Sequence, residues 1–217
     1  MTITNRGRFI TLEGGEGSGK STLLTGLTAR TEALGIQVVR TREPGGTPLA
    51  ESVRALALHP PDGQNWSPLA EALLMNAARA SHLDELIRPS LDAGHWVLCD
   101  RFSDSTLAYQ SVGGVPMATL RAMETSVLKN TAPDLTLILD AAPEDLIERR
   151  RSRGEALDVF EARPQAFHTA VRNAFVSIAH SDPSRYVLID ALASADDVLD
   201  AAWSAIAERF TPAHATP

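Results

Sequence analysis

Cysteine is almost absent from this chain of 217 residues. The single cysteine, Cys99, excludes a disulfide within the chain, and because it ends an apolar run we expect it to be a small buried core residue. Long apolar stretches are missing too: no run reaches the roughly 18 residues that a membrane-spanning helix needs, and the N-terminus lacks the apolar core of a signal peptide. We therefore expect a soluble, cytoplasmic protein with no membrane partner.

Positive charge is also scarce. Lysine and arginine together number 20 against 27 acidic residues, which gives a net charge of −7. General nucleic-acid binders carry a basic excess that neutralises phosphates, so this balance argues against a nucleic-acid partner. Lysine occurs only at Lys20 and Lys129. Any anion site in this chain must therefore be built locally.

The chain has no Pro/Gly/Ser-rich stretch that would divide it. With 44% hydrophobic residues it can bury one large core. We therefore predict a single domain over residues 1–217, with the Ala/Thr/Pro-rich segment 211–217 as a frayed tail.

A glycine-rich segment near the N-terminus matches the phosphate-loop pattern Gly-x4-Gly-Lys-[Ser/Thr] at every required position. Its residues are Gly14, Gly15, Glu16, Gly17, Ser18, Gly19, Lys20 and Ser21, followed by Thr22. A β-rich run precedes the loop and a helical period follows it, as the motif requires. Backbone N–H groups in such a loop bind phosphate, Lys20 would neutralise the β- and γ-phosphates of ATP, and the Ser21 hydroxyl would bind Mg²⁺. The sequence thus predicts ATP and Mg²⁺ as cofactors.

Apolar runs that alternate with helical periods predict a parallel sheet. The class is α/β, a three-layer P-loop NTPase fold with a five-stranded parallel sheet flanked by helices. The expected strands are 8–13, 36–40, 95–99, 134–140 and 185–190, and the expected helices are 21–33, 67–88, 117–129, 143–155, 161–180 and 195–210.

Polar residues follow two of these strands, at the edge where open α/β sheets bind ligands. The loop 41–48 after the second strand brings Arg42 and Glu43 toward the site, although a solvated loop fits equally well. Asp100 and Arg101 follow the third strand, where phosphate-loop proteins hold the metal and a second phosphate. Asp100 could instead cap the next helix, with Ser103 and Asp104 as competing caps.

The helix expected over 67–88 begins with Ser67 as its N-cap. Its predicted apolar face consists of Leu69, Leu73, Leu74, Ala77, Ala80, Leu83 and Ile87. Arg79 lies next to this face, and on pattern alone such an arginine more often extends its charged head into water than takes part in a site.

An arginine-rich segment over about 149–161 contrasts with the acidic character of the rest of the chain. A run of charges is usually a solvated surface. Gly154 and the polar residues around it nevertheless favour a short lid that closes over phosphates, because arginines on such a lid stabilise transferring charge and exclude water.

Four separated signatures together resemble those of the thymidylate kinases, from Phe9 to about Phe210. They are the phosphate loop with Glu16 inside it, Thr41–Thr47 (TREPGGT), Asp100–Phe102 followed by Ser105, Thr106 and Ala108–Gln110, and Arg149-x-Arg151-x-Arg153 with Gly154 and Glu155. The resemblance implies MgATP-dependent conversion of dTMP to dTDP on a five-stranded parallel sheet, in a protein that works as a homodimer.

The resemblance also implies roles for individual residues. On the dTMP side, Arg79 would lie near the base, Arg101 on the phosphate, Tyr109 against the 2′ position, Glu16 near the 3′-hydroxyl, and Ser105, Thr106, Gln110 and Arg42 around the nucleotide. On the ATP side, Arg149 would stack on adenine, Arg151 and Arg153 would reach the phosphates, and Asp100 and Ser21 would serve Mg²⁺. Catalysis would involve Lys20, Arg101, Arg151, Arg153 and Glu16.

Three features distinguish this sequence within the family pattern. Gly17 and Ser18 leave the phosphate loop without a basic residue besides Lys20, which is similar to the branch that carries its catalytic arginines on the lid. Met75, four residues before Arg79, replaces the usual phenylalanine that stacks on thymine, and we expect its thioether to take that place. Ala156 is one extra residue in the lid.

Two other functions compete with this interpretation. One is a kinase for another nucleotide or for a nucleoside. The other is a non-catalytic nucleotide switch, but the sequence has no Asn-Lys-x-Asp motif for guanine and places its arginines in a lid instead.

Overall fold

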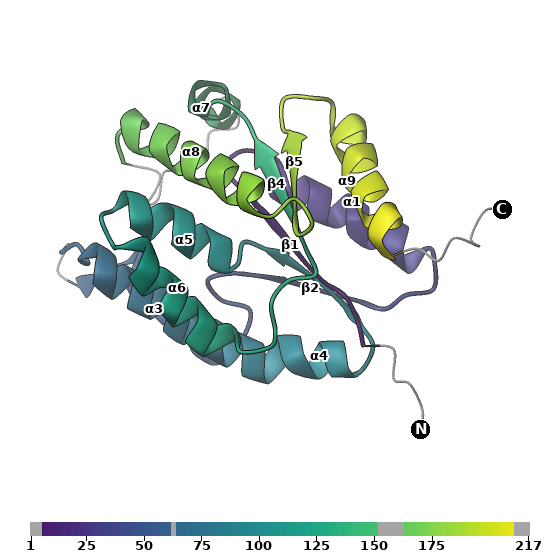
Figure 1. Cartoon of the computed structure of the whole chain (residues 1–217), viewed down its shortest axis with the longest axis horizontal. Helices are drawn as coiled ribbons and strands as arrows, with labels where there is room; N and C mark the ends of the chain where they lie inside the picture. The colour runs from purple at the N-terminus through teal and green to yellow at the C-terminus, as the bar shows by residue number, and fades with distance from the viewer. Residues whose placement is uncertain (1–5, 62–63, 152–162, 211–217) are drawn as a thin grey trace.

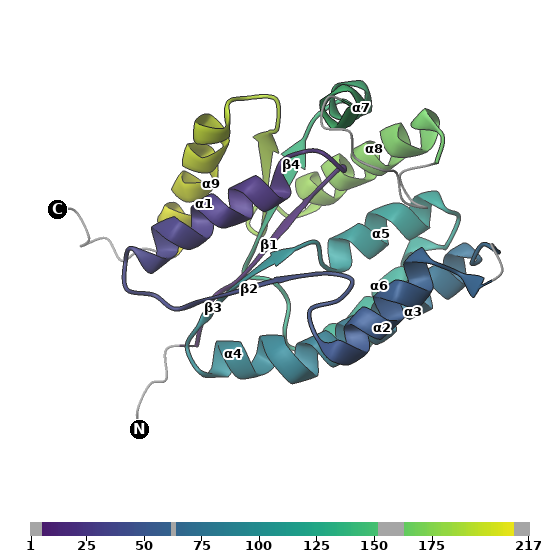
Figure 2. The same cartoon turned by 180° about the vertical axis from the view of Figure 1, so that it is seen from behind.

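A parallel sheet of five strands forms the centre of the molecule in a computed structural model that describes residues 6–61, 64–151 and 163–210. Its strand order is β2-β3-β1-β4-β5, and every neighbouring pair is parallel. The strands are β1 Phe9–Gly14, β2 Val38–Arg42, β3 Trp96–Asp100, β4 Leu135–Asp140 and β5 Tyr186–Asp190. Figures 1 and 2 show helices on both faces of the sheet. The three-layer α/β fold is therefore confirmed.

Burial explains why the strands read as apolar runs. All six residues of β1 are buried, as expected for the middle strand of a sheet that is covered on both faces. Successive side chains point to opposite faces: Ile10 and Leu12 join one core cluster, whereas Phe9 joins another.

The helices divide between these two faces. Helices α1 Lys20–Glu32 and α9 Ala195–Phe210 pack together over the core that contains Ile10 and Leu12 (Figure 1). The other face carries α3 Pro68–His82, α4 Arg88–Asp92, α5 Ser103–Val112, α6 Met117–Leu128 and α8 Gln165–Ser181, with α2 Pro48–Leu58 packed on α3 and α7 Pro143–Arg151 packed on α8. Within the described ranges, no helix is long and apolar enough to cross a membrane.

The second strand begins and ends two residues later than predicted. Parallel pairing with β3 extends to Arg42, which lies opposite Asp100, so the predicted loop 41–48 begins inside the strand. Helix α2 was not predicted at all. It begins with Pro48 in its first turn, a favourable N-terminal signal that follows directly on Thr47.

The helix predicted over 67–88 is interrupted. Ser67 caps its start through a hydrogen bond from the Ala70 N–H to Ser67 Oγ, as expected. After His82 the helix passes through the π-helical turn η2 Leu83–Ile87 into α4. The predicted apolar face is wrong for the first half: Leu69 and Leu73 are 46% and 53% exposed, because α3 packs through the opposite side.

Candidate active site

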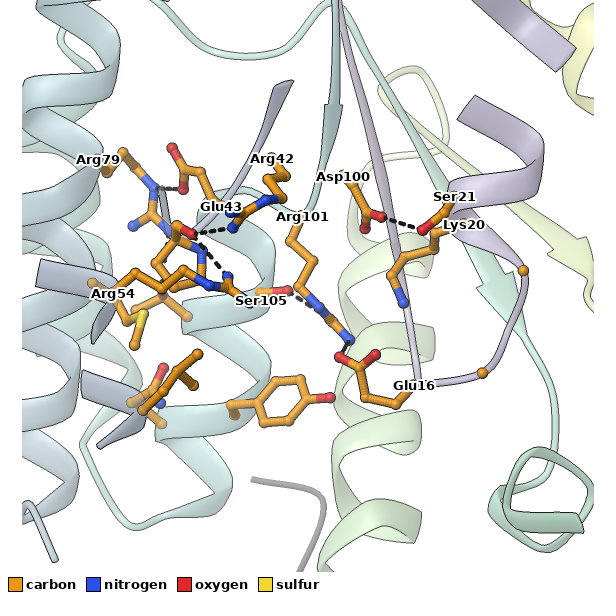
Figure 3. A pocket seen from close by; sticks show the side chains of 18 of the residues that line it. Glu16, Lys20, Ser21, Arg42, Glu43, Arg54, Arg79, Asp100, Arg101 and Ser105 are labelled. Carbon is orange, nitrogen blue, oxygen red and sulfur yellow. Dashed lines mark hydrogen bonds and ion pairs between the residues drawn. The ribbon is translucent and has the colours of Figure 1, made fainter. Parts of the chain in front are cut away.

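A cavity of about 300 Å³ lies at the carboxyl ends of β1, β2 and β3, between the phosphate loop and helices α3 and α5 (Figure 3). Its position follows from the sheet order. The connections after β1 and after β3 leave the sheet on opposite faces, and the crevice between them is where open α/β sheets bind ligands. Its lining includes the loop residues Glu16, Gly17, Gly19, Lys20, Ser21 and Thr22 and the predicted acceptor residues Arg42, Met75, Arg79, Arg101, Ser105, Thr106, Tyr109 and Gln110.

The phosphate loop has the conformation that its glycines permit. Gly14 has a φ of 130°, and a Cβ atom there would lie 2.4 Å from the Leu139 carbonyl oxygen. Gly19 has a φ of 96° and directly precedes the first residue of α1, Lys20. The Lys20 ammonium donates to the carbonyl oxygens of Gly14 and Gly15 at 3.3 and 2.8 Å. Burial lowers the pKa of Lys20, and nearby Arg101 lowers it further. The loop carbonyls thus hold the Lys20 ammonium beside the backbone N–H groups that bind phosphate.

Ser21 and Asp100 form the oxygen-rich corner of the cavity. Ser21 Oγ donates to Asp100 Oδ2 at 3.1 Å (Figure 3). The alternative interpretation of Asp100 as a helix cap is wrong, because the N-cap of α5 is Phe102, and Ser103 and Asp104 lie within that helix. A hydroxyl and a carboxylate beside a phosphate loop fit Mg²⁺, which prefers oxygen ligands and takes few of them from protein.

Arg101 projects into the middle of the cavity from a left-handed backbone position, with a φ of 68°. Its Nη1 donates to Ser105 Oγ at 3.0 Å, its Nη2 bonds Glu16 Oε1, and its guanidinium carbon lies 5.5 Å from the centroid of the Tyr109 ring. Glu16 is therefore the internal counter-ion of Arg101. A bound phosphate would replace that carboxylate as the partner of the guanidinium.

Arg79 is held by a buried network and is only 3% exposed. Its Nε donates to Glu43 Oε2 at 2.8 Å, and its Nη2 donates to the Phe102 carbonyl and to Thr106 Oγ1. His82 Nδ1 lies 3.0 Å from the other Glu43 oxygen. The pattern-based expectation of an arginine that extends into water is therefore wrong, because the partners of the guanidinium are protein groups.

Glu13 organises the backbone turn that carries Arg101. Its Oε1 accepts from the N–H groups of Phe102 and Ser105 at 2.8 and 3.2 Å, and its Oε2 accepts from Ser105 Oγ at 2.6 Å. Burial and, to a smaller extent, the charge of Asp104 raise the pKa of Glu13 from 4.5 to about 7, against the opposing effect of Arg101. No sequence pattern predicted a role for Glu13.

We expect Glu13→Gln to become more stable relative to the wild type as pH rises. The unfolded chain releases this proton near pH 4.5 and the folded protein near 7, so the folded wild type binds more protons in between and loses stability as pH increases through that window. The amide introduced by the substitution does not titrate. From pH 5 to 8 the free energy of unfolding should shift by about 2.5 kcal/mol in favour of the variant. Urea unfolding at both pH values measures this shift, and a constant difference would contradict it.

The remaining predicted residues divide into three groups. Met75 and Gln110 are buried in the cavity wall, and half-exposed Arg42 lies at its edge in an ion pair with Glu51 at 3.0 Å. Arg149 lies elsewhere, with Nη1 donating to the Ala191 carbonyl at 2.6 Å and Nη2 to the Leu192 carbonyl. Three predicted features lie outside the described residues: the side chain of Arg151, the lid residues 152–161 with Arg153 and Ala156, and the tail 211–217.

Several site residues were missed by sequence reasoning. Arg54 on α2 donates to the Pro44 carbonyl at 2.8 Å and lines the cavity. Glu71 and His82 hold residues of its wall. Helical spacing could have found both, because Glu71 lies eight residues before Arg79 and His82 three residues after it, on the same face of the helix.

Comparison with known proteins gives one consistent result. The thymidylate kinase family profile matches residues 12–202. A thymidylate kinase of Bradyrhizobium sp. (strain BTAi1) is 50% identical over 209 residues, covering 94% of this chain and 92% of the relative, and one of Pseudomonas fluorescens (strain Pf0-1) is 54% identical over 186 residues, covering 85% and 88%. The crystal structure of the Ehrlichia chaffeensis thymidylate kinase superposes with a TM-score of 0.75 at 33% identity, covering 93% of this chain and 99% of that one. The profile spans the phosphate loop, the Arg101 turn and the strands that carry them, and the chain belongs to the thymidylate kinase family.

Proposed function

We propose that this protein is a nucleoside monophosphate kinase that transfers the γ-phosphoryl group of ATP to dTMP and releases dTDP, in the pathway to dTTP. The observation that carries the proposal is the cavity that Lys20 of the phosphate loop lines together with Arg101 and Arg79. One site thus holds cations for two phosphate-bearing ligands. The names of the relatives point to the same reaction.

On the donor side, the loop N–H groups and Lys20 bind the β- and γ-phosphates of ATP. Ser21 and Asp100 would hold Mg²⁺, which neutralises phosphate charge when bound. Arg149 would bind near the adenine, and Arg151 and Arg153 would reach the phosphates from the lid.

On the acceptor side, Arg101 binds the dTMP phosphate, with Ser105 and Glu16 holding the guanidinium before the substrate arrives. Glu16 then faces the sugar hydroxyl, and the buried Tyr109 ring crowds the 2′ position. Met75, Arg79, Thr106 and Gln110 surround the base, with Arg42 at the edge of the cavity.

Phosphoryl transfer in this site needs no protein nucleophile. An oxygen of the dTMP phosphate attacks the γ-phosphorus of ATP, the new P–O bond forms as the bond to the bridging oxygen breaks, and ADP takes the electron pair. Lys20 and Arg101 hold the two anions in line and stabilise the charge that spreads over the transferring group.

A coupled ADP-release assay with dTMP, dUMP, ribosyl TMP and thymidine tests this assignment. We expect turnover to be fastest with dTMP, and none with thymidine because Arg101 then has no phosphate to bind. Thymidine turnover equal to that of dTMP would mean that the protein is a nucleoside kinase instead. We place the reaction in the cytoplasm, in keeping with a buried, unpaired Cys99 that needs no oxidising compartment.

We further propose that the protein is a homodimer that pairs through α2 and α3. These helices pack together and expose four large apolar side chains: Leu49, Leu56, Leu69 and Leu73. Between Pro68 and Ala80 the charged residues are Glu71 and Arg79, and both are buried, so the outer side of α3 carries no charge. A helix side that faces water usually carries charges, and an exposed apolar one marks an interface. The same surface on two copies forms a two-fold contact.

Leu73→Glu should convert the dimer to a monomer. Two copies would bring the introduced carboxylates together in an apolar interface, at a cost of several kcal/mol. Light scattering after size-exclusion chromatography measures the mass. Leu34→Glu is the matched control, because Leu34 is 55% exposed and lies outside α2 and α3, against 53% for Leu73. If Leu73→Glu kept the mass of a dimer, as Leu34→Glu should, pairing through this surface would be contradicted.

A further inference from the structure

A buried carboxylate on α3 connects the wall of the cavity to the start of α8. Glu71 is 8% exposed. Its Oε1 accepts from Arg163 Nη2 at 2.6 Å, and its Oε2 accepts from Gln110 Nε2 at 3.2 Å. Arg163 also lies over the Phe167 ring, 4.6 Å from its centroid. Glu71 therefore joins Gln110, which lines the cavity, to Arg163, which precedes α8.

This contact fixes which end of the Gln110 amide faces outward. An amide has a donor end, Nε2, and an acceptor end, Oε1, and the two are nearly equal in shape. An ionised carboxylate only accepts hydrogen bonds, so Glu71 selects the orientation in which Nε2 points toward it. Gln110 lines the cavity, and Oε1 is the end left for a ligand there.

The fixed amide distinguishes pyrimidine bases. Thymine carries an N–H donor at N3, which an amide oxygen accepts. Cytosine has an acceptor at N3, so the same oxygen would oppose another acceptor, and a polar mismatch in a buried site is discriminated strongly. We propose that Glu71 is a positioning residue that sets base specificity by holding the Gln110 amide with its oxygen toward the substrate. This inference rests on the proposed function, which places the base at this wall.

Arg163 makes the arrangement firm. A guanidinium–carboxylate hydrogen bond is stronger than one between neutral groups, and the Glu71 side chain is only 10% exposed, so water competes little for its oxygens. With Oε1 held by Arg163, Oε2 stays directed at Gln110. Arg163 thus supports the specificity of a site that it does not line.

The test compares kcat/KM for dTMP and dCMP in Glu71→Gln. The substitution keeps the shape of the side chain but brings a donor, which can pair with the Gln110 oxygen and turn its amide over. We expect the preference for dTMP over dCMP to fall at least ~10-fold, a change of about 1.4 kcal/mol, with the KM for ATP unchanged. If Glu71 had a purely structural role, kcat/KM would fall equally for both substrates and their ratio would stay unchanged.

Glu124→Gln is the matched control. Glu124 is paired with Arg121 at 2.8 Å and its side chain is 12% exposed, but it does not line the cavity. Its substitution should leave the base preference as in the wild type. Arg163→Gln is the second variant, should Glu71→Gln fail to fold, and we expect it to lower the preference about 3- to 10-fold by freeing Glu71.

Gln110→Ala separates this inference from the proposed function. If the KM for dTMP rises in Gln110→Ala while the base preference stays within about 2-fold of wild type in Glu71→Gln and Arg163→Gln, Glu71 does not position the amide and only the inference fails. If Gln110→Ala leaves the KM for dTMP unchanged, the base does not bind at this wall, and the proposed placement of dTMP fails together with the inference.

Discussion

Lys20→Ala should lower kcat/KM by about 1,000-fold and leave the protein folded. Removing one preorganised positive group from an anion-stabilising site typically costs 10²- to 10³-fold or more. The Lys20 ammonium is buried against the carbonyls of Gly14 and Gly15, at the position where the β- and γ-phosphates of ATP would bind. Because burial disfavours the charged form of this amine, as its lowered pKa records, its loss should cost the fold little. ADP release and thermal unfolding measure the two effects.

Lys129→Ala is the control that the sequence itself offers. Lys129 is the other lysine of the chain and lies exposed at the end of α6, outside the cavity. Its removal should leave both activity and stability unchanged. Normal turnover in Lys20→Ala would refute the assignment of the loop, whereas an unfolded Lys20→Ala would mean that the ammonium is needed to hold the loop carbonyls together.

Much of the fold could be predicted because its signals are local. Short β-rich runs predict the strands, and each of the five occurs within two residues of its prediction. The terminal helix α9 has the predicted bounds, Ala195–Phe210. Leu73 was predicted less well, because apolar periodicity shows that a helix has an apolar side but not whether that side is buried in the core or exposed.

The site residues likewise divide into those with a local sequence signal and those without one. The phosphate loop could be found because eight consecutive residues carry the whole motif. The pairing of Glu43 with Arg79 and His82 could not, because it joins the residue that follows β2 to α3 across 36 and 39 residues of sequence. Glu13 was missed for another reason: it lies inside an apolar strand, and its hydrogen bonds go to a turn more than 85 residues away. Pairings between segments far apart in the sequence leave no periodic signal.

Arg101 gives the second large effect, and its backbone allows two contributions to be separated. Arg101→Ala and Arg101→Gly both remove the guanidinium proposed to bind the dTMP phosphate. Each should lower kcat/KM for dTMP by about 1,000-fold, as expected for the loss of an arginine that stabilises a transferring phosphoryl group. The KM for ATP should change little, because Lys20 and the loop N–H groups hold that ligand. Steady-state kinetics with each substrate varied in turn measures these effects.

The two variants should differ in stability even though they are equally inactive. Arg101 has a φ of 68°, a left-handed conformation that strains every residue with a Cβ atom but not glycine. At this position glycine raises the free energy of unfolding by releasing strain, and lowers it by making the unfolded chain more flexible. The first effect is the larger, so Arg101→Gly should be more stable than Arg101→Ala by about 0.5–1 kcal/mol. Both variants remove the same contacts of the guanidinium with Glu16 and Ser105, so that cost cancels in the comparison. A glycine variant that is less stable than the alanine variant would show that the turn is not strained, and retained dTMP turnover in either variant would assign the acceptor phosphate to another cation.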